Sequence, residues 1–576
     1  MIKPPHPTRL LVFLFLACLP ALLPAQPLPE LNDRIQRSVE RLTDQDRQPA
    51  FTRDFLLADV RLNPTDPRRF YNFSGDLSGR YLEVIALLPR AERGTVDLPD
   101  LVRGIVAEQR PDGRFGDAEL DFVAGPIGGE HMALLWGNGR MLVGLMTYYA
   151  TSGDERALTA ARRLGDFFIG TAEACRRPAT VEQLKSFGAK GIICFTQYIE
   201  GLALLARATG DDRYLQAAAD NYDVLPERGK QHSHGYLSTL RGVLLLYEQS
   251  RNPDHLAYVR TQFDDLLASE DHNRYGAVFE YFGGKEDASD AGHSGERDEG
   301  CSSADFARLA LHLYRVTGEE NYRAAGLNAT YNALLYNQYA SGDFGHHYYD
   351  DGVLRASNPR RSWWCCTMHG LRALLALRDE FTLDTRGRTV TLDHLLPQHY
   401  VDENHAFTLT LTSVSPEAVA YELRVERWED DRPLTVRAPH WGSAWTLPTA
   451  VRLEAGGTYE ITGKPGLTLF TPDDEPLAEF PAQPRAGYLR YGPYLLGINQ
   501  ETFVAEPDWA NQVDLSTLRA DADIPFALRA RFRHGGYPGE HDVVLVPYAR
   551  QLATSHGYMR LVTGYGMRVV PVSPDR

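Results

Sequence analysis

The sequence predicts a mainly α-helical protein with a β-rich C-terminal part: a closed toroid of paired helices followed by one or two β-sandwiches. Helical periodicity dominates up to about residue 385, and short β-rich runs dominate after it. A recurring turn with glycine followed by an acidic residue divides the helical part into hairpins. These observations set three segments: a leader at residues 1–25, a helical domain at 26–385 and a β region at 386–576.

The leader has the features of a secretory signal peptide. Arg9 precedes an apolar run at residues 10–23, and small residues follow that run. We therefore expect residues 1–25 to be removed and the protein to be exported to the periplasm or the medium. Cys18 could accept a lipid anchor, but residues 15–17 fit a lipoprotein signal poorly, so we do not expect anchoring.

The composition after the leader excludes several classes of protein. No apolar stretch reaches the ~18 to 20 residues that a transmembrane helix needs. The formal net charge is −16, and no basic block stands out against it, which argues against a nucleic-acid partner. The 43% of hydrophobic residues is ordinary for a globular protein. We expect an uncharged ligand or one that is recognised locally.

Residues 26–385 have room for about a dozen helices. The dividing turns are Thr151-Ser152-Gly153-Asp154, Thr209-Gly210-Asp211 and Thr317-Gly318-Glu319. In each, glycine can end one helix in the left-handed conformation, and the acid favours the start of the next. The intervals between the turns are unequal, so this is not a strict short repeat. A toroid fits better, with an irregular helical domain as the alternative.

Residues 386–576 alternate strands with tight turns. The β-rich runs are residues 407–412, 434–437, 543–546 and 561–563. Glycine- and proline-containing turns, such as residues 455–457 and 463–466, separate such runs. One or two sandwiches are expected, and the sequence does not give the boundary between them.

Five cysteines remain after the leader, and an odd number cannot all form disulfides within one chain. Cys175 and Cys194 lie 19 residues apart and could close a disulfide loop. The other three cysteines then form a separate group of thiols.

That group has the composition of a metal site. Cys365 and Cys366 are adjacent, and neighbouring cysteines are strained when bonded to each other, but their sulfurs can converge on a soft metal. Glu299 and Cys301 offer a carboxylate and a third thiol at tight spacing. The four residues make a candidate zinc site, with three buried and inert cysteines as the alternative.

Both halves of this site are expected beside a helix start. Residues 302–305 resemble a capping box, which would place Glu299 and Cys301 on the loop before that helix. Thr367 can cap the next helix, with the vicinal cysteines just ahead of it. The partial positive charge at a helix start favours thiolates.

The chain resembles glycoside hydrolase family 127, the β-L-arabinofuranosidase-like group, over most of its length. The resemblance rests on Glu299-Gly300-Cys301, Tyr331-Asn332-Ala333-Leu334, Trp364-Cys365-Cys366, Arg437-Ala438-Pro439-His440-Trp441 and Arg490-Tyr491-Gly492-Pro493. It implies an (α/α)6 barrel with a zinc bound by one glutamate and three cysteines, here Glu299, Cys301, Cys365 and Cys366. It also implies that Cys365 is the nucleophile of a retaining glycosidase.

A retaining glycosidase also needs an acid/base, and here the sequence departs from the family. Family members place a Gly-Glu pair after a Gly-Gly pair and well ahead of the zinc ligands. In this chain Gly283-Gly284 is followed by a shortened, rewritten loop, in which Glu296 keeps the Gly-Glu pairing. We predict Glu296 as the acid/base, with Glu286 and Glu280 as competitors.

Five further residues are predicted to bind substrate. His131, His234 and His346 come from three histidine-containing segments that could line the mouth of a toroid, although a lone histidine is more often structural. Trp364 could stack on a sugar face, or belong to the core. Arg361 follows Arg360, and only Ser362 separates it from the Trp-Trp-Cys-Cys run.

These arginines suggest that the sugar or its neighbour in the polymer carries an acidic group, because guanidinium groups bind carboxylates bidentately. The alternative is that they form ordinary salt bridges.

The sequence thus predicts an exported retaining glycoside hydrolase that acts on oligosaccharides derived from plant or algal polysaccharides. Two other classes stay open. A polysaccharide lyase can have the same architecture, and His346, His347, Tyr348 and Tyr349 could serve as its base and acid. A non-catalytic carbohydrate-binding protein could use the same cleft.

Overall fold

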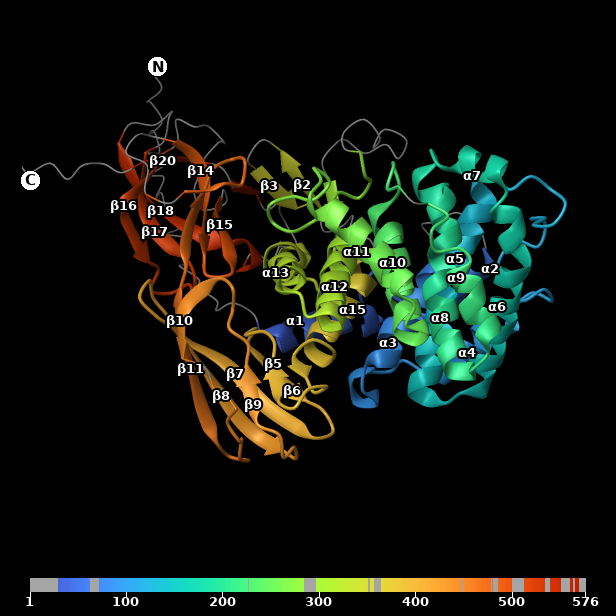
Figure 1. Cartoon of the computed structure of the whole chain (residues 1–576), viewed down its shortest axis with the longest axis horizontal. Helices are drawn as coiled ribbons and strands as arrows, with labels where there is room; N and C mark the ends of the chain where they lie inside the picture. Colours follow the sequence, from blue (N-terminus) through green and yellow to red (C-terminus); the bar gives the residue numbers. More distant parts are fainter. Residues whose placement is uncertain are drawn as a thin grey trace, which may run out of the picture.

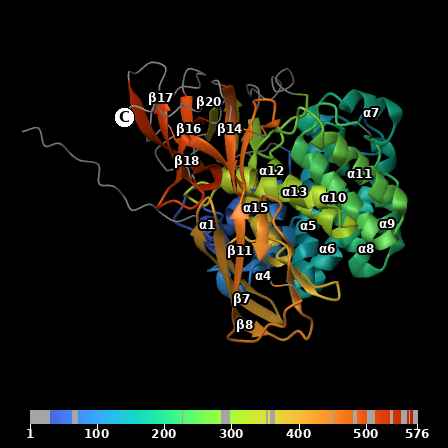
Figure 2. The same cartoon turned by 60° about the vertical axis from the view of Figure 1, so that its left-hand side comes forward.

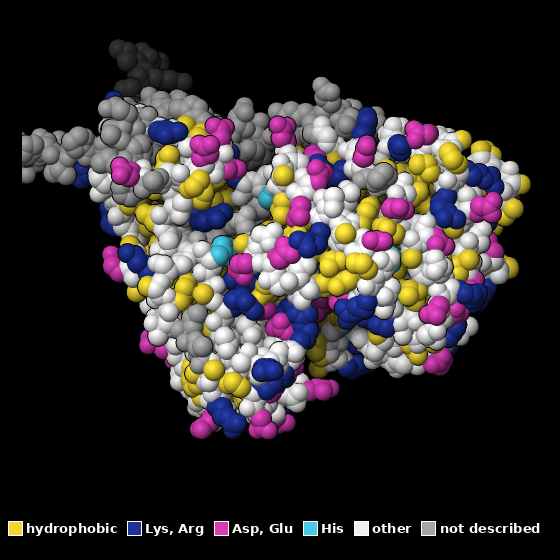
Figure 3. Space-filling model, in the orientation of Figure 1, with side chains coloured by type: hydrophobic (Ala, Val, Ile, Leu, Met, Phe, Trp, Pro, Cys, Tyr) yellow, Lys and Arg dark blue, Asp and Glu magenta, His cyan; other side chains and the backbone are white. Residues whose placement is uncertain are grey.

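The computed structural model of the chain describes residues 30–62, 72–225, 227–283, 297–350, 353–356, 364–446, 448, 450–477, 479, 485–499, 512–533, 539–550, 560–562 and 565–568. Figure 1 shows a helical region on the right and β-sheets on the left. None of the described helices is long and apolar enough to cross a bilayer. Acidic and basic side chains are interspersed over the face drawn in Figure 3.

Six helices form a closed inner ring. They are α3 (Asp76–Leu87), α5 (Gly129–Ser152), α8 (Tyr198–Thr209), α10 (Ser233–Ser250), α12 (Gly300–Thr317) and α15 (Trp364–Asp379). Each packs against the next in this order, and α15 packs against α3, which closes the ring. This confirms the predicted (α/α)6 toroid.

A second layer of helices covers the ring. It consists of α1 (Leu31–Thr43), α2 (Arg53–Arg61), α4 (Leu98–Ala107), α6 (Glu155–Cys175), α7 (Pro178–Leu184), α9 (Asp212–Ala219), α11 (Pro253–Leu267) and α13 (Glu320–Ala329). In several pairs an outer helix packs on the inner helix next to it in sequence, as α6 does on α5 and α13 on α12. A π-helical turn (Thr330–Leu334) and α14 (Leu335–Asn337) follow α13.

The predicted turns join successive helices. Gly153, Gly210 and Gly318 end their helices in the left-handed conformation, with φ of 68°, 65° and 76°. Asp154 and Asp211 then accept hydrogen bonds from the first turn of the next helix. Side chains other than glycine rarely adopt such φ values, so these three positions fix where the hairpins turn.

The C-terminal part forms three sheets. The five-stranded sheet has the order β10 (Gly442–Thr446), β11 (Thr458–Pro465), β8 (Val419–Trp428), β7 (His405–Val414) and β6 (Gln398–Val401). A three-stranded sheet combines β4 (Leu383–Asp384), β5 (Val390–Leu392) and β9 (Leu434–Val436). Strands β7 and β8 alternate buried and more exposed residues along much of their length, and β7 contains the predicted run at residues 407–412.

The twelve-stranded sheet contains the remaining strands. In chain order these are β1 (Arg297–Glu299), β2 (His346–Asp350), β3 (Val353–Ala356), β12 (Leu467–Phe470), β13 (Pro476–Leu477), β14 (Arg485–Tyr491), β15 (Tyr494–Asn499), β16 (Gln512–Ala520), β17 (Leu528–Arg533), β18 (Glu540–Pro547), β19 (Arg560–Val562) and β20 (Tyr565–Arg568). Figure 2 shows the C-terminal strands beside the helical region.

Strands β1, β2 and β3 lie in the segment for which only helices were expected. They extend the twelve-stranded sheet because β3 pairs antiparallel with β19, more than 200 residues later in the chain. Helical periodicity carries no information about such a long-range pairing. Helix α15 ends at Asp379 and β4 begins at Leu383, but the domain boundary at residue 385 stays a prediction.

The disulfide that Cys175 and Cys194 could have closed is not formed. Both are buried free thiols. Cys175 ends α6, whereas the Cys194 sulfur lies 2.7 Å from the carbonyl oxygen of Ala189. Both cysteines are part of the hydrophobic core of the helical region.

Candidate active site and metal centre

Two neighbouring inner helices bring three cysteines together. Cys301 lies in the first turn of α12, and Cys365 and Cys366 lie in the first turn of α15. One ligand atom of each residue lies within 4.8 Å of the other two, and the sulfurs of Cys365 and Cys366 are 4.0 Å apart. Cys301 and Cys366 have at most 1% of their surface exposed, whereas Cys365 has 8%. Cys365 is therefore the thiol of the three most accessible from outside.

Both helices begin earlier than the sequence suggested. Helix α12 begins at Gly300 rather than after a capping box, because the Asp305 carboxylate contacts His234 and Arg241 instead of the start of its own helix. Helix α15 begins at Trp364, so Thr367 lies inside the helix. Its hydroxyl accepts from the backbone N–H of Phe344 and donates to the carboxylate of Asp343. The cysteines thus lie within the positive ends of the two helices, not on loops before them.

Glu299 precedes α12 and supplies a carboxylate to the same place. One of its oxygens lies within 4.8 Å of ligand atoms of His346 and Cys366, and Oε2 is 3.5 Å from Nε2 of His232. Burial alone would raise the pKa of Glu299, but the neighbouring histidines, His232 first among them, outweigh burial and hold that pKa well below its usual range. Glu299 is therefore an anion that is fixed in place.

This donor set fits a tetrahedral metal. Two sulfurs bound to one zinc at ~2.3 Å would lie about 3.8 Å apart, close to the 4.0 Å between Cys365 and Cys366. Thiolates and a carboxylate are ligands that zinc accepts, and the three thiols are close enough to share one metal ion. The cluster is thus consistent with a metal site.

The three thiols differ in acidity. Hydrogen bonds from Cys301 and then Cys366 hold the pKa of Cys365 well below its usual range. Burial raises the pKa of Cys301 and Cys366. In the absence of a metal, the negative charge of the cluster therefore settles on Cys365, the most accessible sulfur.

Glu280 lies next to this cluster. Its carboxylate oxygens are 3.8 Å from Nε2 of His232 and 3.7 Å from Nε2 of His346, and Arg297 forms an ion pair with it. Its backbone N–H donates to the carbonyl of Arg297 at 2.8 Å, and its own carbonyl accepts from Ser233 at 2.9 Å. Only 8% of Glu280 is exposed. A glutamate from the segment before the rewritten loop is thus held rigidly beside Glu299.

The predicted site residues divide into three groups. Glu299, Cys301, Cys365, Cys366 and His346 are brought together, as described above. Glu296 and Arg361 lie outside the described residues, as does the competitor Glu286. His131, His234 and Trp364 have other surroundings.

The contacts of these three residues are mainly with the fold of the protein. His131 accepts from Gly128 N–H and contacts the carbonyl of Asp121, so its contacts are with the entry to α5. Trp364 packs edge-on against Phe55 at 5.8 Å between ring centres and is 7% exposed. His234 is 1% exposed and bonded to Asp305. Their roles in substrate binding stay predictions.

His232 is the residue that sequence reasoning passed over. It stands between Glu280 and Glu299, at the N-cap position of α10. The signal was present, since His232 and His234 form one His-Ser-His segment. Residues two apart at a helix start point in different directions, and sequence alone does not say which of the two faces the site.

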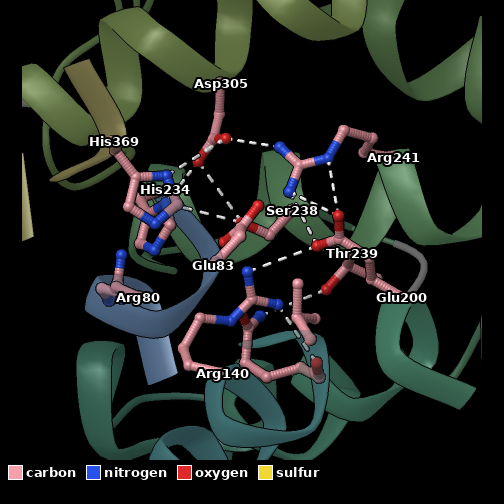
Figure 4. Close-up of polar contacts among 12 residues, drawn as sticks. Arg80, Glu83, Arg140, Glu200, His234, Ser238, Thr239, Arg241, Asp305 and His369 are labelled. Atoms are coloured by element: carbon pink, nitrogen blue, oxygen red, sulfur yellow. Dashed lines mark hydrogen bonds and ion pairs between the residues drawn. The ribbon is translucent and has the colours of Figure 1, made fainter. Parts of the chain in front are cut away.

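A network of charged side chains connects the inner helices (Figure 4). Asp305 lies one turn after Cys301 on α12, and its carboxylate contacts His234, Arg241 at 2.5 Å and His369 at 3.5 Å. Arg241 also pairs with Glu200 at 2.7 Å, and Glu200 pairs with Arg140 at 3.3 Å.

The network joins five of the six inner helices, namely α5, α8, α10, α12 and α15. Burial would raise the pKa of Glu200, but Arg241 and Arg140 lower it to about 2. The network thus fixes the helix starts that carry the cysteines.

Comparison with known proteins gives consistent matches. Residues 68–379, more than half of the chain, match the model of the β-L-arabinofuranosidase GH127 catalytic domain. No curated protein matches the sequence.

Several solved structures are similar over nearly the whole chain. A GH127 β-L-arabinofuranosidase from Geobacillus stearothermophilus T6 has 12% identity and a TM-score of 0.63, with 94% of this chain and 99% of that chain covered. A GH127 β-arabinofuranosidase has 13% identity and a TM-score of 0.63, with 94% and 96% covered. A third structure, described as a glycoside hydrolase, has 14% identity and a TM-score of 0.60, with 92% and 95% covered. At such identities the likeness shows a shared fold.

Proposed function

The chain belongs to the GH127 β-L-arabinofuranosidase-like family of glycoside hydrolases, and on that premise we propose that it is an exported retaining glycosidase with Cys365 as nucleophile. The observation that carries the proposal is the convergence of Cys301, Cys365 and Cys366 at the starts of two adjacent inner helices, with a Glu299 oxygen within 4.8 Å of a ligand atom of Cys366. Export rests on the signal-peptide features of residues 1–25.

We propose zinc as the metal held by these four residues. When bound, it would keep the thiols deprotonated and oriented. His232 and His346 lie near the Glu299 oxygens and can hold the orientation of that carboxylate.

The chain's own residues then account for a double displacement. The Cys365 thiolate attacks the anomeric carbon and a C–S bond forms while the glycosidic C–O bond breaks, with a carboxylic acid giving its proton to the leaving oxygen. The same carboxylate next takes a proton from water. The water oxygen bonds to the anomeric carbon, the C–S bond breaks, and the thiolate returns with overall retention of configuration.

The candidates for the acid/base are Glu280, Glu296 and Glu286. The contacts of Glu280 favour it, because a buried carboxyl beside two histidines and the cysteine cluster is held where a proton must be delivered. Glu296 has the Gly-Glu pairing in its favour. Glu296 and Glu286 belong to the rewritten loop, whereas Glu280 precedes it.

We propose furanosidic oligosaccharides from plant or algal polysaccharides as substrates. An acidic group on the sugar or its neighbour is supported by the sequence Arg360-Arg361 just ahead of the cysteine pair. Arg297, two residues before Glu299, forms an ion pair with Glu280.

One experiment tests the stereochemical outcome and the acid/base together. The mature protein is assayed on aryl β-L-arabinofuranoside and related furanosides, and NMR of the first product anomer is expected to show retention. Glu280→Gln should lose most activity on substrates with poor leaving groups but keep the first step on an aryl glycoside, and azide should restore turnover. Glu296→Gln is the matched variant.

Azide rescue of Glu296→Gln alone would transfer the acid/base role to Glu296. An inverted product would refute the double displacement.

The lyase alternative makes a separate prediction. Lyase action would give unsaturated, ultraviolet-absorbing products from uronides. The Nδ1 of His347 lies 2.7 Å from the Asn337 amide nitrogen and 3.4 Å from Asp298, and its ring lies 4.4 Å from that of Tyr336. These contacts fix the side chain of His347, one of the residues that a lyase could use as its base.

A further inference from the structure

A cavity lies where the helical region meets the β-sheets, and it shares no residue with the cysteine site. It has a volume of about 220 Å³ and is lined from α1, the turn before α14, β7, β8, β15 and the segment before β17. Its polar lining groups include Arg34, Tyr331, Tyr421 and Tyr494. At ~30 Å³ for each molecule of liquid water, this space would hold roughly seven waters.

Three tyrosine hydroxyls face this space. Tyr331, Tyr421 and Tyr494 are each at most 5% exposed. In the described part of the chain none of the three hydroxyls has a hydrogen-bond partner, and none is among the fully enclosed polar atoms without one. The hydroxyls therefore end in the cavity itself. Burial raises the pKa of all three tyrosines, so they remain hydrogen-bond donors.

A buried cation lies in the same wall. Arg34 is 1% exposed, and its guanidinium donates to the carbonyls of Leu335 at 2.8 Å and Ala549 at 2.5 Å and to the side chain of Gln338 at 3.3 Å. Among the described residues no carboxylate forms an ion pair with it. Burial lowers the pKa of Arg34 to about 10, so it is still charged at neutral pH. A buried charge without a counter-ion is costly, and an anion in the cavity would relieve that cost.

The rest of the wall is mostly apolar, and together with the mouth of the cavity it limits which ligands fit. Leucine and proline side chains and Phe526 make up most of it. The mouth opens where Glu30, Pro397, Thr410 and Pro525 are only half-buried. Glu30 would repel a second negative charge near the entrance. The lining therefore suits a small ligand with one anionic group and an apolar body.

We propose that this cavity is a binding site for a small monocarboxylate, with the carboxylate held by the hydroxyls of Tyr331, Tyr421 and Tyr494 in the field of Arg34. The body of the ligand lies against the leucines and Phe526. An aromatic or aliphatic acid and a sugar acid share this chemistry, and the apolar wall favours the former. The site does not depend on the glycosidase activity.

The test measures binding directly, by calorimetry and by the shift in melting temperature of the mature protein. Benzoate and cyclohexanecarboxylate probe an apolar acid, and glucuronate probes a sugar acid. Benzyl alcohol and glucose are the neutral counterparts. Benzoate is expected to bind and to raise the melting temperature, and benzyl alcohol is not. If only glucuronate binds, the cavity is still a carboxylate site, but its ligand is a sugar acid instead of an apolar acid.

Two variants separate the site from the fold. Tyr421→Phe and Tyr331→Phe each delete one hydroxyl and keep the ring, and each should weaken benzoate binding about tenfold or more, because a hydrogen bond to a charged group is lost. Tyr400→Phe is the matched control in the same sheet as Tyr421, since its hydroxyl bonds Asp402 at 2.8 Å and does not line the cavity.

The proposal is overturned if neither acid binds, if benzyl alcohol binds as well as benzoate, or if the two cavity variants bind the acid as the control does. Each of these results is independent of whether furanosides are hydrolysed.

Discussion

Asp305 and Arg241 form an ion pair at 2.5 Å in the centre of the helical ring, and the Asp305 side chain has no exposed surface. Asp305 stands one helical turn after Cys301, and Arg241 stands two turns after His234. The pair therefore links the helix that supplies a candidate ligand to the helix that begins beside Glu280. Its loss should affect both the stability of the ring and the geometry of the site.

Arg241→Met tests this link. Removing one partner of a buried pair typically costs about 3–5 kcal/mol, because the other charge stays buried without compensation. Here both Asp305 and Glu200 would lose a partner, so a large fall in the free energy of unfolding by urea is expected. Arg213→Met is the control, since Arg213 is exposed and pairs with Asp211 on the surface; it should unfold like the parent protein. Equal behaviour of the two variants would contradict the structural role.

The metal content gives the second prediction. The mature protein should contain about one zinc per chain, because three thiols are grouped and Glu299, within 4.8 Å of a ligand atom of Cys366, can supply the fourth ligand. Removal of the metal by a chelator should lower the melting temperature and abolish turnover, and added zinc should restore both. Native mass spectrometry measures the stoichiometry. Cys194→Ser, which removes a buried thiol outside the cluster, should keep the metal. Active metal-free protein with Cys365 and Cys366 in disulfides would refute the zinc model.

The third prediction separates the nucleophile from a ligand. Cys365→Ser should lower kcat by at least about a thousandfold, as the loss of a catalytic nucleophile commonly does. Cys301→Ser should reduce metal content and stability together with activity. A haloacetamide is expected to label Cys365 first, since it is the most exposed and most acidic of the three thiols. If Cys365→Ser leaves labelling and turnover unchanged, the nucleophile lies elsewhere.

The pH dependence of stability gives the fourth prediction. His394 is fully buried between α15 and the sheets, and burial lowers its pKa to about 4. Its Nδ1 accepts from the backbone N–H of Leu396, and its Nε2 contacts Thr382 and the carbonyl of Leu377, so the neutral ring fits and the cation does not.

Between pH 6.5 and 4 the unfolded chain therefore binds a proton at this position that the folded chain does not. Stability should fall as the pH is lowered through that window, by about 1.4 kcal/mol per pH unit for one proton. Urea unfolding of the parent and of His394→Gln measures it. In His394→Gln the unfolding free energy should change less with pH across this window, by the amount that one bound proton contributes. An unchanged pH dependence would contradict the role given to His394.

The fifth prediction concerns substrate charge. If Arg361 binds an acidic group, Arg361→Ala should lower kcat/KM on an acidic oligosaccharide about tenfold or more and leave a neutral furanoside nearly unchanged. The two substrates are assayed on one preparation, so the ratio corrects for stability. An equal loss on both would mean that Arg361 forms an ordinary salt bridge.

Much of the candidate site could be predicted from sequence because its ligands come in short local motifs. Glu299 and Cys301 are two residues apart, and Cys365 and Cys366 are adjacent, so each half is fixed by its own chain geometry. The helical ring was equally predictable, since Gly153, Gly210 and Gly318 carry the turn chemistry that ends one helix before the next. Local sequence determines such features because neighbouring residues cannot separate.

What only the tertiary structure decided are the contacts between distant segments. The pairing of β3 with β19 and the cavity around Tyr331, Tyr421 and Tyr494 join residues far apart in the chain, and no local pattern encodes them. The same holds for the contact of Glu280 with His232. It also holds for Asp305, which the sequence places in a possible capping box but which pairs with Arg241 and His234 in the structure. A side chain takes the partner that packing brings within bonding distance, and for these residues that partner lies on another element.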